Sequence, residues 1–563
     1  MNPITNIMSI ALEMLGNNAI NRLKKQSLNA KKINFDLLFK MLDDNKDTEL
    51  GKKYHFADIK TIEDYKKMVP PMGYEDYAPL IERVIDHGET NLYTVYNVKT
   101  YALSSGSVGV PKRIPVTDIS LEKYTLYGAY RPFATVANAY KARGQKIKHG
   151  RGLNAFDVVS TPTKDGKTLS GCVSGSAADT AKPAMPFMLS TPVDVVYPPE
   201  KMDTKYLDVL FALRDEKLSY MLGVFMTGIV DEMAYIKDNW ESLCDDVEKG
   251  IINPETKISP EMKAKLEKQM KPLPQRAAFL REEFKKGFDD PWLKRIWPDL
   301  SWAGAIGTGG FKAYTEKFKQ LAGEDLPIDF MIYGASEGMF AAALEADAEE
   351  YMLIPDGGFY EFVPEDIDDY SVTYTLDQLE VGKKYELLVT NLSGFYRYKL
   401  KDVIEVTGYY NEAPLIKFSY RKNQLINLAG EKITENDLAW AVKEFAKDAN
   451  IRVVDYCVYG DTDFPPGRYQ VIIEPEDKPD LSKSEEYSKL IDEKLGIANE
   501  GGYKYERDEG CLAPALLLFS QPQTNALYRD LMVYRGGSVN QIKPARVIDN
   551  PIKEKIFLNM IEK

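Results

Sequence analysis

Short apolar runs, broken by glycine and polar turns, dominate the chain from residue 300 onward. Examples are WAGAIGTGG, IDFMIYGASEG, YMLIPDGGFYEFVP and YELLVTNLSGFYRYKL. Runs of this length and composition, bounded by glycine, are typical of strands. Segments with apolar residues at helical spacing lie between some of these runs. Residues 200–300 are rich in charge and also helical in pattern. Strands that alternate with helices predict an α/β fold with mixed β-sheets and helices.

A change of pattern near residues 419–423 predicts a domain boundary. After it, a polar turn leads through a short strand into a helix, a strand pair, a second helix and a last strand, APALLLF. This segment of about 140 residues has the size of a single domain. We therefore predict a large N-terminal domain over 1–420 and a small α+β C-terminal domain over 421–563.

Residues 1–45 carry apolar side chains at helical spacing, which predicts a helix. The side chains in this pattern include Ile7, Ile10, Ala11, Met14 and Leu15. We expect this apolar face to pack against the protein and not to anchor the chain in a membrane. No basic start precedes the apolar stretch and Glu13 interrupts it, so no signal peptide is predicted. No apolar run approaches the roughly 18 residues that a membrane-spanning helix needs.

The balance of residue types excludes several classes of function. With 85 acidic and 72 basic residues the net charge is −13, opposite to the basic field that neutralises nucleic-acid phosphates. The histidines, His55, His87 and His149, lie too far apart for an HExxH zinc site. A Ser-His-Asp triad stays open, although no GxSxG elbow accompanies them. The four cysteines lack CxxC spacing, so we expect a cytoplasmic protein. The acidic net charge and the lack of a long apolar run predict no nucleic-acid or membrane partner.

The sharpest motif is SSGSVGVPK over residues 104–112, a loop of small residues that ends in Pro-Lys. Residues 92–103 predict a strand before the loop, and residues 118–143 predict a helix after it. Small residues let the backbone approach a charged group closely, and their N–H groups and hydroxyls can bind phosphate oxygens. Pro111 stands where a Walker A motif needs its second glycine. We predict a phosphate-binding loop with Lys112 as its cation; an ordinary surface turn is the alternative.

Two later elements place acidic side chains beside predicted strands. In YGASEG, the hydroxyl of Ser336 and the carboxylate of Glu337 suit a Mg²⁺–phosphate site, because magnesium takes one or two carboxylates plus phosphate oxygens. In YRYKLKD, the Asp402 carboxylate could accept both ribose hydroxyls of a nucleotide. The glycine cluster at 304–310 fails the GxGxxG pattern and predicts a turn that approaches backbone or ligand. Each of these signals is weak by itself.

In order and spacing, these elements resemble those of the adenylate-forming superfamily of acyl-CoA synthetases, luciferases and peptide-synthetase adenylation domains. The loop is similar to TSGTTGxPKG, YGASEG to YGxTE, and YRYKLKD to Y-R-T-G-D. YRKNQLINLAGEKI resembles the hinge motif GRxDxxIKxxGxRI, and GSVNQIKPARV resembles the segment with the catalytic lysine. Within the superfamily the chain most resembles the GH3 family of acyl acid amido synthetases. YEDYAPLIERVIDHGE, YEFVP and GFYRYKLKDVIEVTGYYNEAPLIKFSYRKNQLI carry that resemblance.

The resemblance implies an ATP-dependent ligase that works in two half-reactions. A small carboxylic acid attacks the α-phosphate of ATP–Mg²⁺, which gives an acyl-AMP and pyrophosphate. The amine of an amino acid then takes the acyl group and AMP leaves, while the small domain moves about a hinge near residues 419–423. The resemblance also implies a monomer.

The same resemblance assigns roles to particular residues. Lys543, Glu337 and Lys112 are the expected catalytic residues, with Mg²⁺ held through Glu337, and Lys432 is expected to contact the acceptor or the nucleotide. The residues expected to bind ATP or AMP are Ser104, Ser105, Gly106, Ser107, Gly309, Tyr333, Gly334, Ala335, Ser336, Tyr360, Phe362, Asp402 and Arg421. For Tyr360 and Phe362, a place in the core is the alternative. The candidates to line the acyl pocket, with a place in the core as the alternative, are Tyr124, Tyr127, Phe133, Met221, Phe225 and Met226.

Two departures from the family pattern keep other functions open. The phosphate loop is one residue shorter than the SSGTSAGERK form of the plant enzymes, and Lys401 stands where the family usually has glycine. One alternative is an acyl-CoA synthetase that uses the same adenylation step. The other is a non-catalytic protein that binds a nucleotide or an acyl group.

Overall fold

The computed structural model of the protein divides into two compact units. The residues that the structure describes are 3–104, 112–170, 182–365, 367, 369–422, 428, 431, 433–464, 467–508, 511–535, 542–548 and 551–562. Among these residues, the larger unit runs to Leu400 and includes Ile404–Phe418. The smaller unit contains Lys401–Val403 and continues from Ser419.

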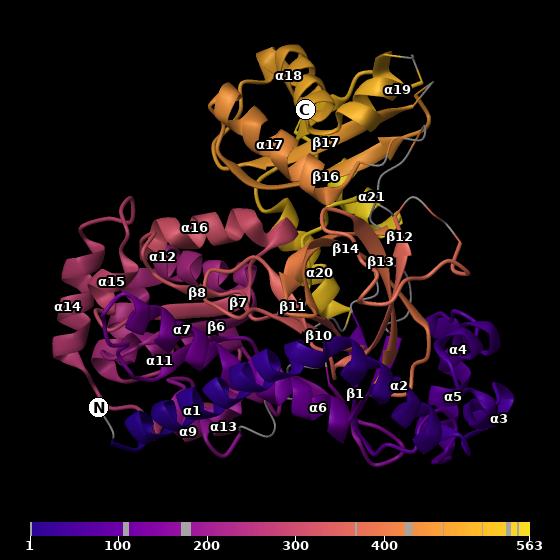
Figure 1. Cartoon of the computed structure of the whole chain (residues 1–563). Coiled ribbons are helices and arrows are strands. Elements are labelled where there is room, and N and C mark those ends of the chain that lie inside the picture. The colour runs from indigo at the N-terminus through magenta and orange to yellow at the C-terminus, as the bar shows by residue number, and fades with distance from the viewer. Residues whose placement is uncertain are drawn as a thin grey trace. The chain divides into compact units, whose positions relative to one another are not determined.

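A parallel four-stranded sheet forms one layer of the larger unit (Figure 1). Its order is β3 (Gly152–Ala155), β6 (Tyr220–Phe225), β7 (Trp302–Ile306) and β8 (Ile328–Asp329). Helices between the strands pack around it, as expected for parallel strands joined by crossovers. These helices are α11 (Thr204–Arg214), α12 (Met226–Lys249), α13 (Pro260–Glu267), α14 (Pro274–Phe284), α15 (Leu293–Ile296) and α16 (Lys312–Ala322).

A seven-stranded sheet, in the order β12-β13-β14-β15-β11-β10-β9, contains most of the apolar runs after residue 330. Neighbouring strands pair antiparallel at β9–β10, β10–β11, β11–β15 and β12–β13. Its strands are β9 (Ile332–Ala335), β10 (Gly338–Ala342), β11 (Tyr351–Leu353), β12 (Gly358–Pro364), β13 (Lys384–Asn391), β14 (Tyr398–Tyr410) and β15 (Ala413–Arg421).

A third sheet, in the order β2-β1-β5-β4, flanks the predicted phosphate loop. Its strands are β1 (Val98–Ser104), β2 (Lys112–Thr117), β4 (Ser160–Pro162) and β5 (Thr168–Ser170). β1 and β2 pair antiparallel on the two sides of residues 105–111, so the strand before the loop is confirmed, although it begins later than predicted. The helix predicted over 118–143 is confirmed as α6 (Asp118–Lys123), the π-helical η3 (Tyr124–Tyr130) and α7 (Arg131–Ala142).

The helix predicted at the N-terminus is confirmed, but it packs through a different face from the one expected. The buried residues of α1 (Pro3–Gln26) include Ser9, Gly16, Ala19, Ile20 and Leu23. A Cβ on Gly16 would lie 2.4 Å from the carbonyl oxygen of Tyr130, so glycine permits close contact with η3. Four of the apolar residues expected to pack, Ile7, Ile10, Met14 and Leu15, are exposed instead. The expectation was wrong for these four because the opposite face of the helix, which carries Gly16, Ile20 and Leu23, is the one that packs.

Other short helices complete the larger unit. They are α2 (Ala30–Asn45), α3 (Glu49–Lys53), α4 (Ile62–Met68), α5 (Tyr74–His87), α9 (Met185–Met188), α10 (Val193–Val196) and the 3-10 turns η1 (Ser27–Asn29), η2 (Phe56–Asp58) and η4 (Gly309–Phe311). Over the described part of the chain, no helix combines the length and the apolar character needed to cross a bilayer.

The smaller unit is an α+β fold around its own apolar core. Its sheet has the order β16 (Val453–Asp461), β17 (Arg468–Pro475) and β18 (Leu516–Phe519). A capping box at Thr434 starts α17 (Glu435–Ala449). The other helices are η6 (Leu481–Lys483), α18 (Ser484–Ala498), η7 (Glu500–Lys504), α19 (Tyr505–Asp508), α20 (Thr524–Tyr534) and α21 (Pro551–Asn559). The predicted α/β class, with a large N-terminal part and a smaller α+β part, is confirmed.

Candidate functional site

Glu337 lies in a two-residue turn between β9 and β10, where Ala335 pairs with Gly338. The turn leaves the carboxylate close to its neighbouring strands, and the Glu337 side chain is almost completely buried. The Tyr398 hydroxyl donates to Glu337 Oε1 at 3.0 Å, and the Asn391 side-chain amide donates to the Glu337 backbone oxygen at 2.6 Å. Because the one hydrogen-bond donor described at this carboxylate, the Tyr398 hydroxyl, is neutral, it would leave the carboxylate free to attract a cation.

Tyr398 also joins Glu337 to Lys112. The Lys112 ammonium donates to the Tyr398 hydroxyl at 3.5 Å and lies 5.5 Å from the centre of the Tyr74 ring. Stacking of Tyr398 on Phe395, with ring centres 4.9 Å apart, holds the phenol in place. Lys112, Tyr398 and Glu337, here named the Glu337 cluster, therefore form a continuous chain of polar contacts. The sequence singled out Lys112 and Glu337 but not Tyr398, although its position in YRYKLKD could have drawn attention to it.

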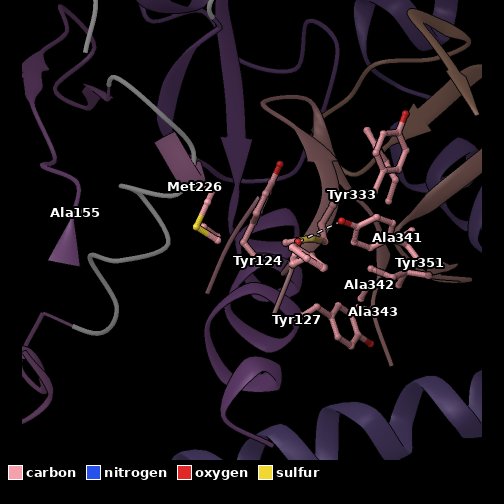
Figure 2. Packing of buried hydrophobic residues seen from close by; sticks show 14 of the residues in the cluster. Tyr124, Tyr127, Ala155, Met226, Tyr333, Ala341, Ala342, Ala343 and Tyr351 are labelled. Atoms are coloured by element: carbon pink, nitrogen blue, oxygen red, sulfur yellow. Dashed lines mark hydrogen bonds between the residues drawn. The ribbon is translucent and has the colours of Figure 1, made fainter. Parts of the chain in front are cut away.

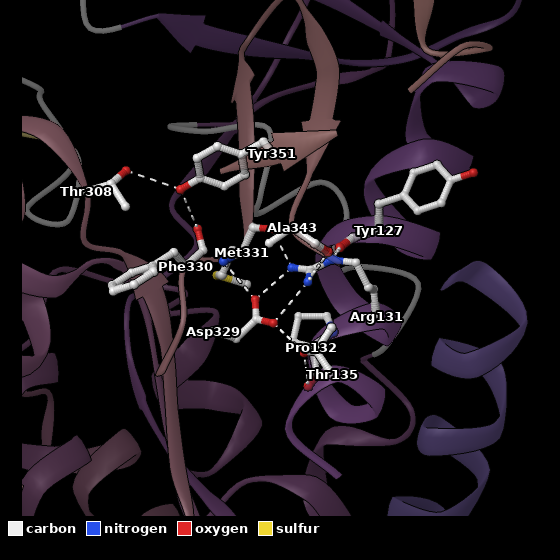
Figure 3. A network of polar contacts seen from close by, with 10 residues as sticks. All are labelled: Tyr127, Arg131, Pro132, Thr135, Thr308, Asp329, Phe330, Met331, Ala343 and Tyr351. Atoms are coloured by element: carbon white, nitrogen blue, oxygen red, sulfur yellow. Dashed lines mark hydrogen bonds and ion pairs between the residues drawn. The ribbon is translucent and has the colours of Figure 1, made fainter. Parts of the chain in front are cut away.

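A buried ion pair fixes the strand that leads into this turn (Figure 3). The Arg131 guanidinium donates to both carboxylate oxygens of Asp329, at 2.6 and 3.0 Å, and to the carbonyl oxygen of Ala343 at 2.8 Å. Thr135 also donates to the Asp329 carboxylate. Because many hydrogen bonds satisfy this buried pair, it resists displacement. It joins α7 to the end of β8 and so positions β9.

Gly309 and Tyr333 approach a single aromatic ring, that of Phe418. Gly309 follows the carboxyl end of β7 with φ of +61°, and a Cβ on it would lie 3.6 Å from Phe418 Cδ1. The Tyr333 ring centre lies 6.1 Å from that of Phe418. Phe418 is half-buried, so part of its ring remains accessible. Sequence reasoning missed this residue, which is now a candidate to stack on a base.

The two aromatic residues expected near adenine belong to the core. Tyr360 and Phe362 on β12 have no exposed surface. The Tyr360 hydroxyl donates to the backbone oxygen of Ile354 at 2.9 Å. Because residues two apart on a strand share a face, both rings point into the same packed layer. The alternative of a place in the core therefore holds for both residues.

Several acyl-pocket candidates are also core residues (Figure 2). Tyr124, Tyr127, Met221 and Met226 are buried in the large apolar cluster, and the Tyr124 hydroxyl donates to the backbone oxygen of Ala335. Phe225, at the end of β6, is only half-buried and stacks on Phe311 with ring centres 4.6 Å apart. The alternative of a place in the core is confirmed for the four buried residues.

Asp402, Arg421 and Lys543 form a second group, named here the Asp402 cluster, within the smaller unit. Arg421 Nε donates to the nearly buried Asp402 carboxylate at 2.5 Å. Lys543 is exposed, and the charges of Arg421, Asp402 and Glu435 act on its ammonium group. Desolvation chiefly lowers the pKa of Lys543; the Arg421 charge lowers it further, while Asp402 and Glu435 oppose the shift. A poorly solvated ammonium group gains more from an anionic ligand than a fully hydrated one.

Lys401 has φ of +66°, the left-handed conformation that favours glycine. The residue lies in β14 directly before Asp402, at the position where the family pattern has glycine. The backbone therefore keeps the geometry of the glycine form although the side chain differs. The presence of lysine instead of glycine at position 401 therefore does not displace Asp402 from its place in β14.

The remaining candidates are only partly described. Ser105, Gly106, Ser107 and Lys432 lie outside the described residues, and Ser104 is the last residue of β1. Gly334, Ala335 and Ser336 belong to β9 and its turn, next to Glu337. No group of three or more histidine, cysteine or acidic side chains suited to a metal occurs among the residues that the structure covers. A cation at this site would therefore need oxygens from a ligand besides Glu337.

Comparison with models of known protein families identifies the family of this chain. Models of the GH3 family N-terminal, central and C-terminal domains match residues 19–328, 351–421 and 436–552. The chain belongs to the GH3 family. This confirms the family predicted from the motifs and, with it, an enzyme of the ligase class.

Relatives of this GH3 protein are named as amido synthetases. Jasmonoyl–L-amino acid synthetase GH3.5 of Oryza sativa subsp. japonica is 27% identical, covering 96% of this chain and 95% of that protein. Probable indole-3-acetic acid-amido synthetase GH3.1 of Arabidopsis thaliana is 26% identical, covering 95% and 92%. The solved structure of GH3.15 acyl acid amido synthetase matches with a TM-score of 0.84 at 23% identity, covering 97% of this chain and 96% of that chain. The last match confirms the fold alone.

Proposed function

We propose that this GH3 protein activates a small carboxylic acid with ATP and transfers the acyl group to the amine of an amino acid. The observation that carries the proposal is the Glu337 cluster, in which one phenol holds a carboxylate and an ammonium group together. A cation and a cation-binding carboxylate are what phosphoryl chemistry requires at neighbouring positions. The names of the relatives, which couple acids to amino acids, support the same reaction.

In the first half-reaction, an oxygen of the acid attacks the α-phosphorus of ATP and pyrophosphate leaves. Proton transfer is not needed, so the protein's task is to stabilise negative charge. Lys112 and the loop residues Ser104, Ser105, Gly106 and Ser107 bind phosphate oxygens in this proposal. Glu337 would hold Mg²⁺ together with those oxygens, and the metal would neutralise developing charge.

The Asp402 cluster contributes binding and charge. Asp402 accepts the ribose hydroxyls, and its contact with Arg421 supports this role because the guanidinium fixes the carboxylate's orientation. Lys543 supplies a cation to the carboxylate and the α-phosphate oxygens. Its lowered pKa supports that role, since a desolvated ammonium group is stabilised by an anionic ligand.

In the second half-reaction, the amine of the amino acid attacks the acyl carbonyl carbon and AMP leaves. We assign ATP and acyl binding to residues 1–420 and a moving domain to residues 421–563, with a hinge near 419–423. The two compact units, which separate after Phe418, support this assignment. In this scheme Lys432 contacts the acceptor or the nucleotide. We also propose that the enzyme acts as a cytoplasmic monomer.

Mass spectrometry of AMP release tests the proposal. Protein, ATP and Mg²⁺ are incubated with a panel of carboxylic acids and pooled amino acids, and matched reactions contain coenzyme A instead. AMP together with a new amide mass is expected, and both should vanish when the acid is omitted. A thioester without an amide would assign the protein to the acyl-CoA synthetases. ATP binding without AMP from any acid would assign it to the non-catalytic binding proteins.

A further inference from the structure

The outer face of α1 exposes large apolar side chains that the larger unit leaves uncovered; Figure 1 shows the course of the helix. Ile7 and Met14 are 63% and 65% exposed, and Ile4, Ile10 and Leu15 are also exposed. At 100° per residue, four of these five side chains fall within about 100° around the helix. Exposed apolar patches of this kind often mark surfaces that bind a partner or a membrane.

The buried face of α1 explains why these side chains stay outside. Gly16 and Ala19 pack towards the larger unit, and a Cβ on Gly16 would meet Ala134 Cβ at 2.8 Å. A side chain at position 16 would therefore clash with α7. The helix cannot turn its apolar face inward without losing this close packing.

Basic side chains outnumber acidic ones in α1 and in residues 141–151, in contrast to the net charge of −13 over the whole chain. Glu13 is the one acidic residue of α1, whose last turns carry Arg22, Lys24 and Lys25. Arg22 pairs with Glu122 and Asp356, and Lys148 pairs with Asp299. The exposed lysines of these two segments that make no ion pair with a carboxylate of the described chain are Lys24, Lys25, Lys141 and Lys146.

Two contacts place the basic segment along the edge of the apolar face. The Asn138 side chain donates to Asn17 Oδ1 at 3.1 Å, and His149 Nε2 lies 3.2 Å from Glu13 Oε1. Glu13 adjoins Met14 in the sequence. Asn138 and His149, which bracket the basic segment, therefore lie beside the middle of α1.

We propose that α1 docks this protein on an anionic phospholipid surface. The helix would lie parallel to the surface, with its apolar side chains among the acyl chains and the neighbouring lysines on lipid phosphates. A second copy of the chain suits the face less well. The apolar strip is only about 17 Å long, which is small against the ~800 Å² per partner of a stable dimer. Two copies would also bring the lysines of each face together.

Sedimentation of the full-length protein with vesicles tests the inference. The vesicles contain phosphatidylcholine alone or with about one third phosphatidylserine. We expect binding to the phosphatidylserine vesicles to exceed binding to phosphatidylcholine by about tenfold, and to fall at high salt. The pair Ile7→Asp and Met14→Asp should abolish binding, and Lys141→Glu with Lys146→Glu should weaken it about tenfold or more.

Matched substitutions elsewhere separate docking from general surface effects. Val381 is 60% exposed and lies outside α1, so Val381→Asp should bind vesicles like the wild type. Lys268→Glu is the corresponding charge control at an exposed site. Because the replaced side chains face solvent, the α1 variants should still fold. An unchanged thermal melting temperature would show that they do.

Two results would overturn the inference. Equal sedimentation with both kinds of vesicle, or wild-type binding by the Ile7→Asp, Met14→Asp variant, would mean that α1 does not dock on anionic lipid. A dimer in analytical ultracentrifugation that the same variant converts to a monomer would assign the face to self-association. The inference is independent of the proposed reaction, since vesicle binding requires neither ATP nor an acid.

Discussion

The Glu337 cluster and the Asp402 cluster each bury a carboxylate, but they give it different partners. Glu337 is 8% exposed and accepts a hydrogen bond from a neutral phenol at 3.0 Å. Asp402 is 3% exposed and accepts one from the Arg421 guanidinium at 2.5 Å. A neutral donor leaves the negative charge of Glu337 for a metal ion, whereas a guanidinium compensates that of Asp402. The contrast supports the proposal that Glu337 binds a metal ion and that Asp402 binds the ribose hydroxyls.

The largest effect should come from the cation of the Asp402 cluster. Lys543→Ala removes an ammonium group that would face developing charge, so acyl-AMP formation should fall about 10³-fold. ATP affinity should change little, because Lys543 acts on the transition state more than on the bound nucleotide. Pyrophosphate release and calorimetric ATP binding measure the two quantities. Lys555→Ala, at an exposed lysine of α21, is the control, and equal losses in both variants would contradict the role.

Glu337→Gln tests whether this carboxylate holds the metal. The amide keeps the shape of the side chain but lacks the charge, so adenylation should fall about 10²-fold. The Mg²⁺ concentration for half-maximal rate should rise, since a neutral amide binds Mg²⁺ weakly. Magnesium titrations of pyrophosphate release measure the shift. An unchanged magnesium requirement would mean that the two clusters do not differ as proposed.

Asp402→Asn should affect the nucleotide and leave the metal alone. Loss of a charged acceptor for the ribose should raise KM for ATP about tenfold. The half-saturating Mg²⁺ concentration should remain that of the wild type. Steady-state kinetics with ATP, and with 2′-deoxy-ATP as a probe of the ribose hydroxyls, check the assignment. If the Asp402→Asn variant discriminated between the two nucleotides as strongly as the wild type does, Asp402 would have no ribose role.

Tyr398→Phe sharpens the comparison within the Glu337 cluster. Removing the hydroxyl breaks its contacts with Glu337 and Lys112 while the stacked ring remains, so the adenylation rate should fall several-fold to about tenfold. The same variant in a Glu337→Gln background should cost less, because the contact is already weakened. Tyr360→Phe, at a buried tyrosine of the core, is the matched control. Additive effects of the two substitutions would rule out coupling between Tyr398 and Glu337.

The smallest effect concerns the backbone beside Asp402. Lys401→Gly should stabilise the protein by about 0.5–1 kcal/mol, because glycine adopts a φ of +66° without strain. Lys399→Gly, two residues earlier on the same strand, should destabilise it by a similar amount. Thermal melting measures both changes. Destabilisation by both substitutions would show that the Lys401 side chain, not its backbone, matters.

Periodicity predicted element types better than it predicted which faces are buried. It placed a helix at the N-terminus, but several large apolar side chains of α1 face outward because the face with Gly16, Ile20 and Leu23 is the one that packs. The family resemblance likewise suggested Tyr360 and Phe362 as candidates to stack on adenine. Both lie in the core, since only the neighbouring layers decide which face of a strand is covered.

The sequence by itself determined the family, the α/β class and the identity of the charged residues, because motifs and their spacing are local properties of the chain. Only the tertiary structure showed that Tyr398 joins Glu337 and Lys112, residues 61 and 286 positions away from it. It also showed that Arg421 compensates Asp402 and that Lys401 keeps the backbone of a glycine. Contacts between distant segments depend on packing, and packing is decided by the assembled layers rather than by any short run of residues.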